Sequence, residues 1–142
     1  MHRERKAEIF MKILEAQNLK KYYGGGDVQV KALDGVDLSI EEGEFTAIVG
    51  TSGSGKYTLV HIVGGLDYAT SGSVTVAGRK IFELNEKELT IFRRRKIGFI
   101  FQSYNLIPIL SIYENIVLPL ELDGRPTDQR FVEDIVRMLG LH

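Results

Sequence analysis

Residues 45–63 read FTAIVGTSGSGKYTLVHIV, and this stretch decides the fold class. Its first part, 45–49, is a short apolar run of the kind that forms a central parallel strand buried on both faces. A glycine-rich loop over 50–58 follows, and the apolar residues after it predict a helix that Gly64 and Gly65 would end. The stretch therefore predicts a strand, a loop and a helix in that order.

The loop has the composition needed to hold a chain of phosphate groups. Gly50, Gly53 and Gly55 allow a tight turn and remove Cβ atoms that would keep an anion away. Lys56 can reach the β- and γ-phosphates, and the start of the helix favours negative charge. The pattern G-x-x-x-x-G-K between a strand and a helix favours a nucleoside triphosphate, most simply ATP, over a glycine-rich turn without a ligand. The predicted nucleotide-binding residues here are Gly50, Thr51, Ser52, Gly53, Ser54, Gly55, Lys56, Tyr57 and Thr58.

Tyr57 departs from this pattern, because the residue after the lysine is expected to be Ser or Thr, whose hydroxyl ligates Mg²⁺. A phenol oxygen lies too far from the backbone to take that position. Thr58 is about 100° further round the helix and cannot simply replace it. We therefore expect weakened Mg²⁺ coordination, while the loop amides and Lys56 still hold phosphate. Two interpretations of Tyr57 stay open: the tyrosine serves a function of its own, or it is a sequence change without biological purpose.

Composition limits the other classes of function. The chain has 142 residues with a net charge of −1, which fits one globular domain and gives no sign of a nucleic-acid partner. It has no cysteine, so disulfides and Cys-ligated metals are excluded. His2, His61 and His142 lack metal-ligand spacing, and no metal other than Mg²⁺ is expected. No segment is long and apolar enough to cross a bilayer.

Hydrophobic patterning predicts strands before and after the loop. Alternation over 28–40 is typical of strands with one covered face, interrupted at Asp34 and Gly35. The glycines at 24–26 indicate a loop over 22–27, and 41–43 reads as a turn. Further strands are predicted over 13–20, 71–78 and 97–101. Together with the central stretch, this order predicts an α/β core with a β-rich N-terminal layer.

Three further helices carry start or stop signals. Asn85 is a candidate N-cap for a helix through Lys96. The basic residues at 93–96 are interpreted as a helix end favoured by the helix dipole, and not as a nucleic-acid patch. Ser111 can cap a helix to about residue 118, with Pro119 breaking it. Thr127 or Asp128 begins the last helix. Residues 1–10 are expected to be a disordered extension or a short helical arm, so the domain is assigned to 11–142.

Three longer stretches resemble the ATP-binding subunit of ABC transporters. They are IVGTSGSGKYTLVHIVGGLDYATSGSV at 48–74, FRRRKIGFIFQSYNLIP at 92–108 and YENIVLPLEL at 113–122. The likeness is greatest to the group serving lipoprotein release, macrolide export and antimicrobial-peptide export, and it covers nearly all of 11–142. It implies a P-loop NTPase core, an N-terminal antiparallel β layer and the beginning of a helical subdomain.

The resemblance also implies roles for residues outside the loop. Tyr23, or Tyr22, matches an aromatic residue that stacks on adenine. Gln102 matches a glutamine that touches Mg²⁺ or the attacking water and senses the γ-phosphate. Without the resemblance, both would read as ordinary loop residues. Plausible contacts for a membrane permease, or packing residues of the helical subdomain, are Tyr104, Leu106, Ile107 and Pro108.

The family's downstream elements do not occur in this sequence: the Ser-Gly-Gly-Gln signature, the strand ending in Asp and Glu, and the switch histidine. We therefore expect an incomplete cassette that binds ATP weakly, hydrolyses little and contains no catalytic residue. Strands that would flank 45–49 are also lacking, so apolar edges should be exposed. The full-length family implies a paired ATPase subunit or homodimer, attached through a permease to the cytoplasmic face of the membrane.

Two other functions stay open at this point. A P-loop small-molecule kinase usually places its phosphate loop near the N-terminus, whereas here strand-like sequence precedes it and no Arg-rich lid follows. A non-catalytic remnant that acts only as an interaction module would give no nucleotide-dependent shift in melting temperature.

Overall fold

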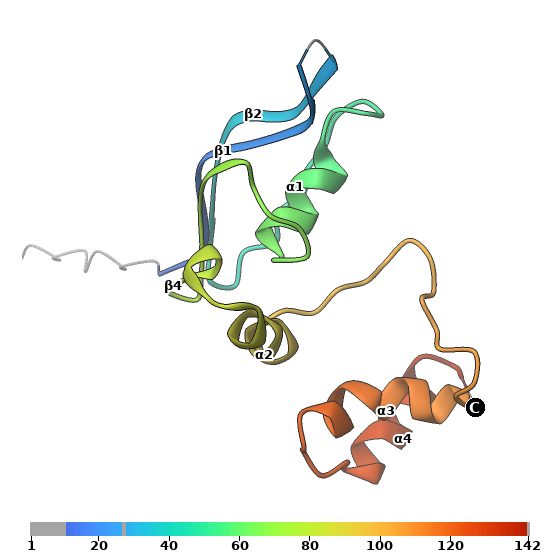
Figure 1. Ribbon diagram of the computed structural model, residues 1–142. Helices are drawn as coiled ribbons and strands as arrows, with labels where there is room; N and C mark the ends of the chain where they lie inside the picture. The colour runs from blue at the N-terminus through green and yellow to red at the C-terminus, as the bar shows by residue number, and fades with distance from the viewer. Residues whose placement is uncertain (1–10, 27, 142) are drawn as a thin grey trace, which may run out of the picture. The chain divides into compact units, whose positions relative to one another are not determined.

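The computed structural model describes residues 11–26 and 28–141. The chain divides into two compact units, of which the first ends at Lys96 and the second begins at Ile97 (Figure 1). The N-terminal extension predicted over 1–10 lies outside the described residues. No helix in the described ranges combines the length and apolar character needed to cross a membrane.

The first unit is built on an antiparallel sheet in the order β2-β1-β3-β4, which confirms the predicted β layer. Its strands are β1 (Lys12–Gly25), β2 (Val28–Glu41), β3 (Ser71–Val76) and β4 (Arg79–Lys80). The loop predicted over 22–27 is wrong for its first part, because β1 continues through Tyr22 and Tyr23. Their pairing with Lys31 and Val30 extends the β1–β2 ladder to the tip of the hairpin.

Strand β2 also differs from the prediction, since it does not break at Asp34 and Gly35. The β1–β2 register shifts between Leu19 and Lys20, and Gly35 takes a left-handed φ of 86° nearby. An irregularity of this kind bends a strand without ending it, because pairing resumes on either side. The alternation of apolar residues thus belongs to a strand, as predicted, but the Asp-Gly pair marks a bulge and not a turn.

Helix α1 (Lys56–Val63) packs on the β1–β2 hairpin and confirms the helix predicted after the loop (Figure 1). Its buried residues are Leu59, Ile62 and Val63. They share the core with side chains from the sheet, namely Ala16, Leu19, Leu33, Val74 and Val76. Burial of these apolar groups fixes the position of the glycine-rich loop, because α1 begins at its last residues.

The apolar run 45–49 is not a strand in this structure, so that prediction is wrong. Phe45 is 97% exposed and Val49 86% exposed, as expected for an apolar edge without covering strands. A central strand needs partners on both sides, and none of the strands found within 11–26 and 28–141 pairs with this run. The strand predicted over 97–101 is absent for the same reason, and Ile100 is fully exposed.

The first unit closes with a short 3₁₀ helix, η1 (Ile81–Glu83), and helix α2 (Glu86–Lys96). Asn85 caps α2 as predicted: its side-chain oxygen accepts from the Glu88 N–H at 3.0 Å, and the Glu88 carboxylate accepts from the Asn85 N–H at 3.1 Å. Arg93 donates to the Gly65 carbonyl oxygen at 2.7 Å. This basic residue therefore joins α2 to the turn that follows α1.

The second unit contains helices α3 (Ile112–Leu122) and α4 (Gln129–Met138), with Val117 and Val132 buried. Ser111 caps α3 and Asp128 caps α4, as the sequence predicts. Pro119 does not break α3, which continues to Leu122. Proline costs a helix one N–H bond, and here it lies so near the end that the closing bonds from the Asp123 and Gly124 N–H groups still form.

Candidate functional site

The loop over 50–58 takes a backbone conformation that favours glycine at its junction with α1. Gly53 and Gly55 have φ values of 78° and 84°, in the left-handed region that side chains disfavour. A Cβ atom on Gly55 would lie 2.3 Å from the Ala32 carbonyl oxygen and 3.2 Å from Leu33. The loop therefore lies directly against β2, and it can do so because residue 55 has no side chain.

Lys56 holds the loop closed from the inside. Its ammonium donates to the carbonyl oxygens of Gly50 at 2.7 Å and Thr51 at 2.6 Å, and to the Ser54 hydroxyl at 3.1 Å. The Ser54 N–H also donates to the Thr51 carbonyl oxygen, at 3.3 Å. The cation is thus encircled by loop atoms, and an anion entering the loop would meet it there.

The N-terminus of α1 carries no cap. Gly55 makes no side-chain hydrogen bond to it, and no acidic residue occurs in its first turn. The other α-helices of the described chain all have such a cap, from Asn85, Ser111 and Asp128. The first N–H groups of a helix need a partner that the helix itself cannot supply. The start of α1 therefore offers N–H donors and a positive dipole end to an anionic ligand.

Tyr57 lies on the outside of the first turn of α1, 69% exposed. Its ring centroid is 3.8 Å from that of His61, with 35° between the ring planes. The residue directly after Lys56 is therefore not a Ser or Thr with a hydroxyl close to the backbone. Thr58, the next residue along the helix, is half-buried. Among the residues that the structure describes, no cluster of three His, Asp or Glu side chains could hold a metal ion. The residues present thus do not supply the expected Mg²⁺ ligand.

Tyr22 and Tyr23 belong to β1, close to the loop. Lys21 pairs with Leu33 in the β1–β2 ladder, and Leu33 lies against Gly55, which brings this end of β1 to the loop. Tyr22 is half-buried and hydrogen-bonded to Asp34, whose carboxylate raises the pKa of the phenol. Tyr23 is 44% exposed. Tyr23 is therefore the better placed of the two for contact with a ligand.

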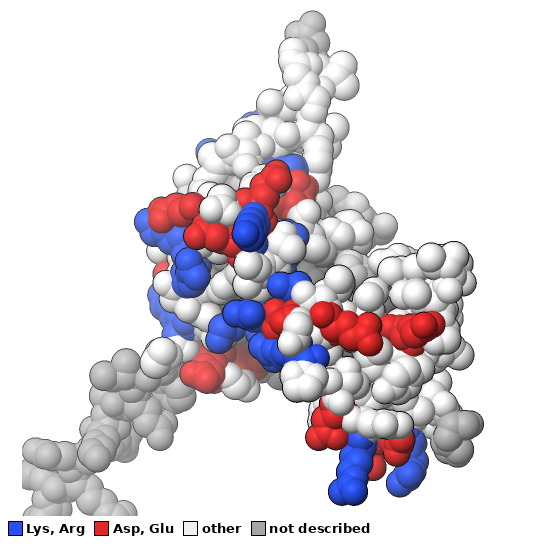
Figure 2. Space-filling view, turned by 60° about the horizontal axis from the view of Figure 1, so that its bottom comes forward, with Lys and Arg blue, Asp and Glu red and all other residues white. Residues whose placement is uncertain are grey.

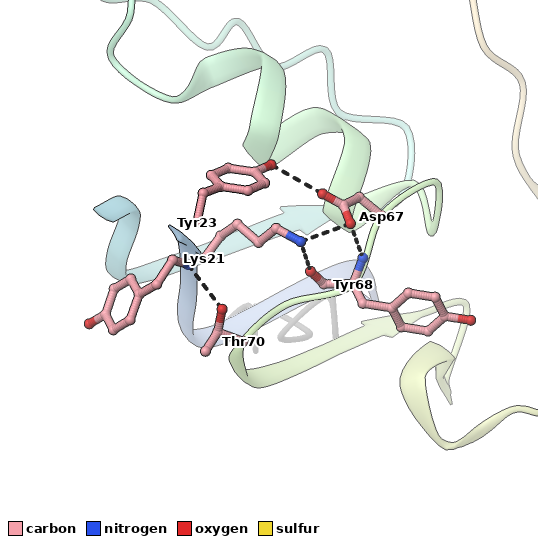
Figure 3. Close-up of polar contacts among 6 residues, drawn as sticks. Lys21, Tyr23, Asp67, Tyr68 and Thr70 are labelled. Carbon is pink, nitrogen blue, oxygen red and sulfur yellow. Dashed lines mark hydrogen bonds and ion pairs between the residues drawn. The ribbon is translucent and has the colours of Figure 1, made fainter. Parts of the chain in front are cut away.

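Asp67 is a residue that sequence reasoning missed. It follows α1, and its carboxylate accepts from the Lys21 ammonium at 2.8 Å, the Tyr68 N–H at 2.7 Å and the Tyr23 hydroxyl at 3.2 Å (Figure 3). Burial alone would raise the pKa of Asp67, but these hydrogen bonds and the Lys21 charge outweigh it and lower the pKa. Lys21 and Asp67 are far apart in sequence, so no local pattern indicated the pair.

The model of the ABC transporter family matches residues 33–142 of the chain. This chain belongs to the ABC transporter family. Family membership confirms the resemblance drawn from the phosphate loop and the two downstream stretches.

Similar proteins agree with this assignment. The chain is 50% identical over 132 residues to the pyoverdine export ATP-binding/permease protein PvdT of Pseudomonas fluorescens, covering 91% of the chain and 20% of PvdT. It is 41% identical over 131 residues to the lipoprotein-releasing system ATP-binding protein LolD of Alcanivorax borkumensis, covering 91% of the chain and 58% of LolD. The chain therefore spans only part of each relative's length.

A solved ABC cassette shares the fold. The structure matches MJ0796, an ATP-binding cassette solved as a dimer in a post-hydrolysis state with ADP and Pi, at a TM-score of 0.75 and 46% identity. The match covers 80% of this chain and 49% of the cassette. This likeness confirms the fold class: an antiparallel β layer followed by helices, in a chain that covers part of an ABC cassette.

Gln102 lies in the second unit of this ABC chain, in an exposed segment without regular structure. The strand expected to precede it is absent, so the position of the Gln102 side chain is not fixed by sheet pairing. Its assigned contact with Mg²⁺ or water stays a prediction. Charged side chains of both signs are visible on the face shown in Figure 2, in keeping with the net charge of −1.

Proposed function

We propose that this chain is the nucleotide-binding part of the ATP-binding subunit of an ABC exporter. The observation that carries the proposal is the uncapped start of α1, which faces a loop that encircles the Lys56 ammonium. A helix start and a lysine at one loop form a binding site for phosphate groups. The chemistry of these donors fits the polyphosphate of ATP.

Binding would require Lys56 to exchange its loop partners for phosphate oxygens. The ammonium now donates to two carbonyl oxygens and one hydroxyl, all of them neutral acceptors. A phosphate oxygen adds the attraction between opposite charges to the hydrogen bond, which the neutral carbonyl and hydroxyl acceptors do not provide, so the exchange favours the anion. The N–H groups at the start of α1 would gain partners in the same step, without a change in the helix.

Tyr23 would provide the platform for the base. Tyr23 is 44% exposed, and an exposed aromatic ring can stack on adenine without base-specific hydrogen bonds. The ring lies on β1, and β1 and β2 form the hairpin against which the loop packs. Phosphate and base sites would thus share one sheet.

Mg²⁺ fits this site poorly, because Tyr57 occupies the position of the expected hydroxyl ligand and its ring lies against His61. We propose that ATP binds without a strong requirement for Mg²⁺ and that hydrolysis is slow. Gln102 is the remaining candidate for a metal contact. No hydrolytic step is assigned to residues of this chain.

In the whole protein, ATP binding would drive export through a membrane permease, with two ATPase subunits paired. The names of the relatives support the first point, since PvdT is an export ATP-binding/permease protein. The dimeric form of the MJ0796 cassette supports the second. Attachment to the cytoplasmic face of the membrane would follow from such a permease contact.

The test is ATP binding measured by calorimetry on the full chain and on Lys56→Ala. Loss of a hydrogen-bonded cation should weaken ATP binding about tenfold or more. Lys87→Ala is the matched control, because Lys87 is an exposed lysine on α2, and it should bind like the original chain. Equal affinity of all three proteins would contradict the proposal, and no heat or melting shift with ATP would favour an interaction module.

A phosphate-release assay on the same proteins tests the claim of slow hydrolysis. We expect no turnover above that of Lys56→Ala, with or without Mg²⁺. Turnover that disappears in Lys56→Ala would show that the chain is a competent ATPase and would contradict this part of the proposal.

A further inference from the structure

Lys21 and Asp67 form a part-buried contact at one face of the Tyr23 ring (Figure 3). The Lys21 side chain is only 14% exposed, although an ammonium group is strongly hydrated in water. Its charge is balanced by the Asp67 carboxylate at 2.8 Å, and it also donates to the Tyr68 carbonyl oxygen at 2.8 Å. Such an arrangement is costly unless each group has a partner, and here each does.

The same two side chains hold the Tyr23 ring at two points. The Lys21 ammonium lies over the ring, 4.9 Å from its centroid, and the Asp67 carboxylate accepts from the phenol hydroxyl at 3.2 Å. The Lys21 ammonium covers one face of the ring, and the hydrogen bond to Asp67 fixes the direction of the phenol hydroxyl. A base can therefore stack only on the face that the ammonium leaves open.

Asp67 also ties the ring to α1. Its N–H and that of Leu66 both donate to the His61 carbonyl oxygen, at 3.3 Å and 2.8 Å, so Asp67 is held by the last turn of the helix. The first turn of this helix carries Lys56, the proposed phosphate ligand. One short helix therefore connects the proposed phosphate site at its start to the residue that holds the proposed base platform at its end.

We propose that Asp67, acting with Lys21, is a positioning residue that orients Tyr23 for stacking on the base of a nucleotide. This inference rests on the proposed function, because it assigns Asp67 a role at the same nucleotide site. Its role is to hold Tyr23, with which it shares a hydrogen bond, and not to contact phosphate or a reacting atom. It lowers the cost of binding by holding the ring in its bound orientation before the base arrives.

The experiment compares two ligands, ATP and inorganic tripolyphosphate, by calorimetry on the full chain. Asp67→Ala should weaken ATP binding about two- to tenfold, the range expected for loss of an aromatic stacking contact. Tripolyphosphate binding should stay unchanged, because it has no base. Asp134→Ala is the matched control, since Asp134 is 72% exposed and lies far along the chain in α4.

Two further variants make the result specific to Tyr23. Tyr23→Phe removes only the hydroxyl that Asp67 holds, so it tests the contact even if Asp67→Ala does not fold. It should weaken ATP binding and leave tripolyphosphate binding unchanged. In a Tyr23→Ala background, Asp67→Ala should cause no additional loss of ATP affinity, because the ring that it positions is gone.

The outcomes separate this inference from the proposed function. Equal losses for ATP and tripolyphosphate in Asp67→Ala, or unchanged ATP binding in both Asp67→Ala and Tyr23→Phe, would overturn the positioning role while leaving nucleotide binding intact. A full additional loss in the Tyr23→Ala background would overturn it too. Failure of the unmutated chain to bind either ligand would contradict the proposed function itself, and the positioning role with it.

Discussion

At the scale of single residues, Gly55 shows most directly how sequence determines the loop. Its φ of 84° and the carbonyl oxygen of Ala32, 2.3 Å from where a Cβ would be, both exclude a side chain. Gly55→Ala should lower the free energy of unfolding by about 2 kcal/mol or more, from left-handed strain plus the clash. Urea unfolding followed by circular dichroism would measure this.

Gly25→Ala is the control for that substitution. Gly25 has no positive φ, and a Cβ there would meet nothing within 4 Å. Its free energy of unfolding should stay within about 0.5 kcal/mol of the original. Equal destabilisation by the two substitutions would mean that the packing of the loop on β2 does not contribute to stability.

Tyr57 leads to a prediction about the metal. Tyr57→Ser supplies a hydroxyl where the phosphate-loop pattern places a Mg²⁺ ligand, so ATP affinity should become dependent on Mg²⁺. Tyr57→Phe keeps the ring beside His61 and supplies no ligand, so its affinity should remain insensitive to Mg²⁺. Calorimetry in Mg²⁺ and in EDTA distinguishes the two. Mg²⁺ dependence already present in the unmutated chain would contradict the account of Tyr57.

At the scale of elements, the cap of α3 is a local stabilising device that the sequence identified. The Ser111 hydroxyl accepts from the Glu114 N–H at 3.2 Å, and the Glu114 carboxylate accepts from the Ser111 N–H at 2.7 Å. Loss of such a cap costs about 1 kcal/mol, so amide hydrogens in the first turns of α3 should exchange about fivefold faster in Ser111→Ala. Ser111→Thr keeps the hydroxyl and should exchange like the original; fast exchange in both would disprove the cap.

The same cap makes α3 sensitive to acid. Hydrogen bonds from Ser111 lower the pKa of Glu114 below its ordinary value of 4.5. A carboxyl whose pKa is lower in the folded state stabilises that state above pH 4.5, and this contribution disappears as the pH falls through the lowered pKa. NMR titration should show the pKa of Glu114 rising toward 4.5 in Ser111→Ala. An unchanged pKa would mean that Ser111 is not its cause.

Among the elements, most of the correct predictions rest on local signals. Three kinds of feature depend only on neighbours within a few residues: the helix after the loop, the alternation along β2, and the helix caps at Asn85, Ser111 and Asp128. The apolar runs 45–49 and 97–101 also carry a strand signal, but a strand needs partners elsewhere in the chain, and pattern alone does not show whether they exist.

The candidate site divides in the same way. The glycine-rich loop before α1 could be predicted because its signal lies in consecutive residues, while its role in binding phosphate stays a prediction. The contacts of Tyr23 could not, since Asp67 reaches it from after α1, and its placement depends on how the helix packs on the hairpin. Pro119 shows the opposite error: a strong local signal for a break, overridden because the helix ends so soon afterwards.

At the scale of the whole molecule, two compact units are joined by an exposed segment after Lys96. Tyr104 in that segment is 93% exposed, and Phe45 in the first unit is 97% exposed. Chymotrypsin at a low ratio of protease to protein should therefore cleave first after Tyr104 and Phe45, because proteolysis concentrates at exposed, irregular backbone. Mass spectrometry of the first fragments checks this, and early cleavage inside α1 or β1 would contradict the described packing.

The central claim is that main-chain N–H groups at the start of α1, together with Lys56, bind the phosphates of ATP. The most direct measurement is an NMR titration of the isotope-labelled full chain with ATP in EDTA. The account predicts large amide shifts at Gly53, Gly55 and Lys56, and smaller ones in α3 and α4. Unchanged loop amides at saturating ATP, or shifts confined to the second unit, would contradict it.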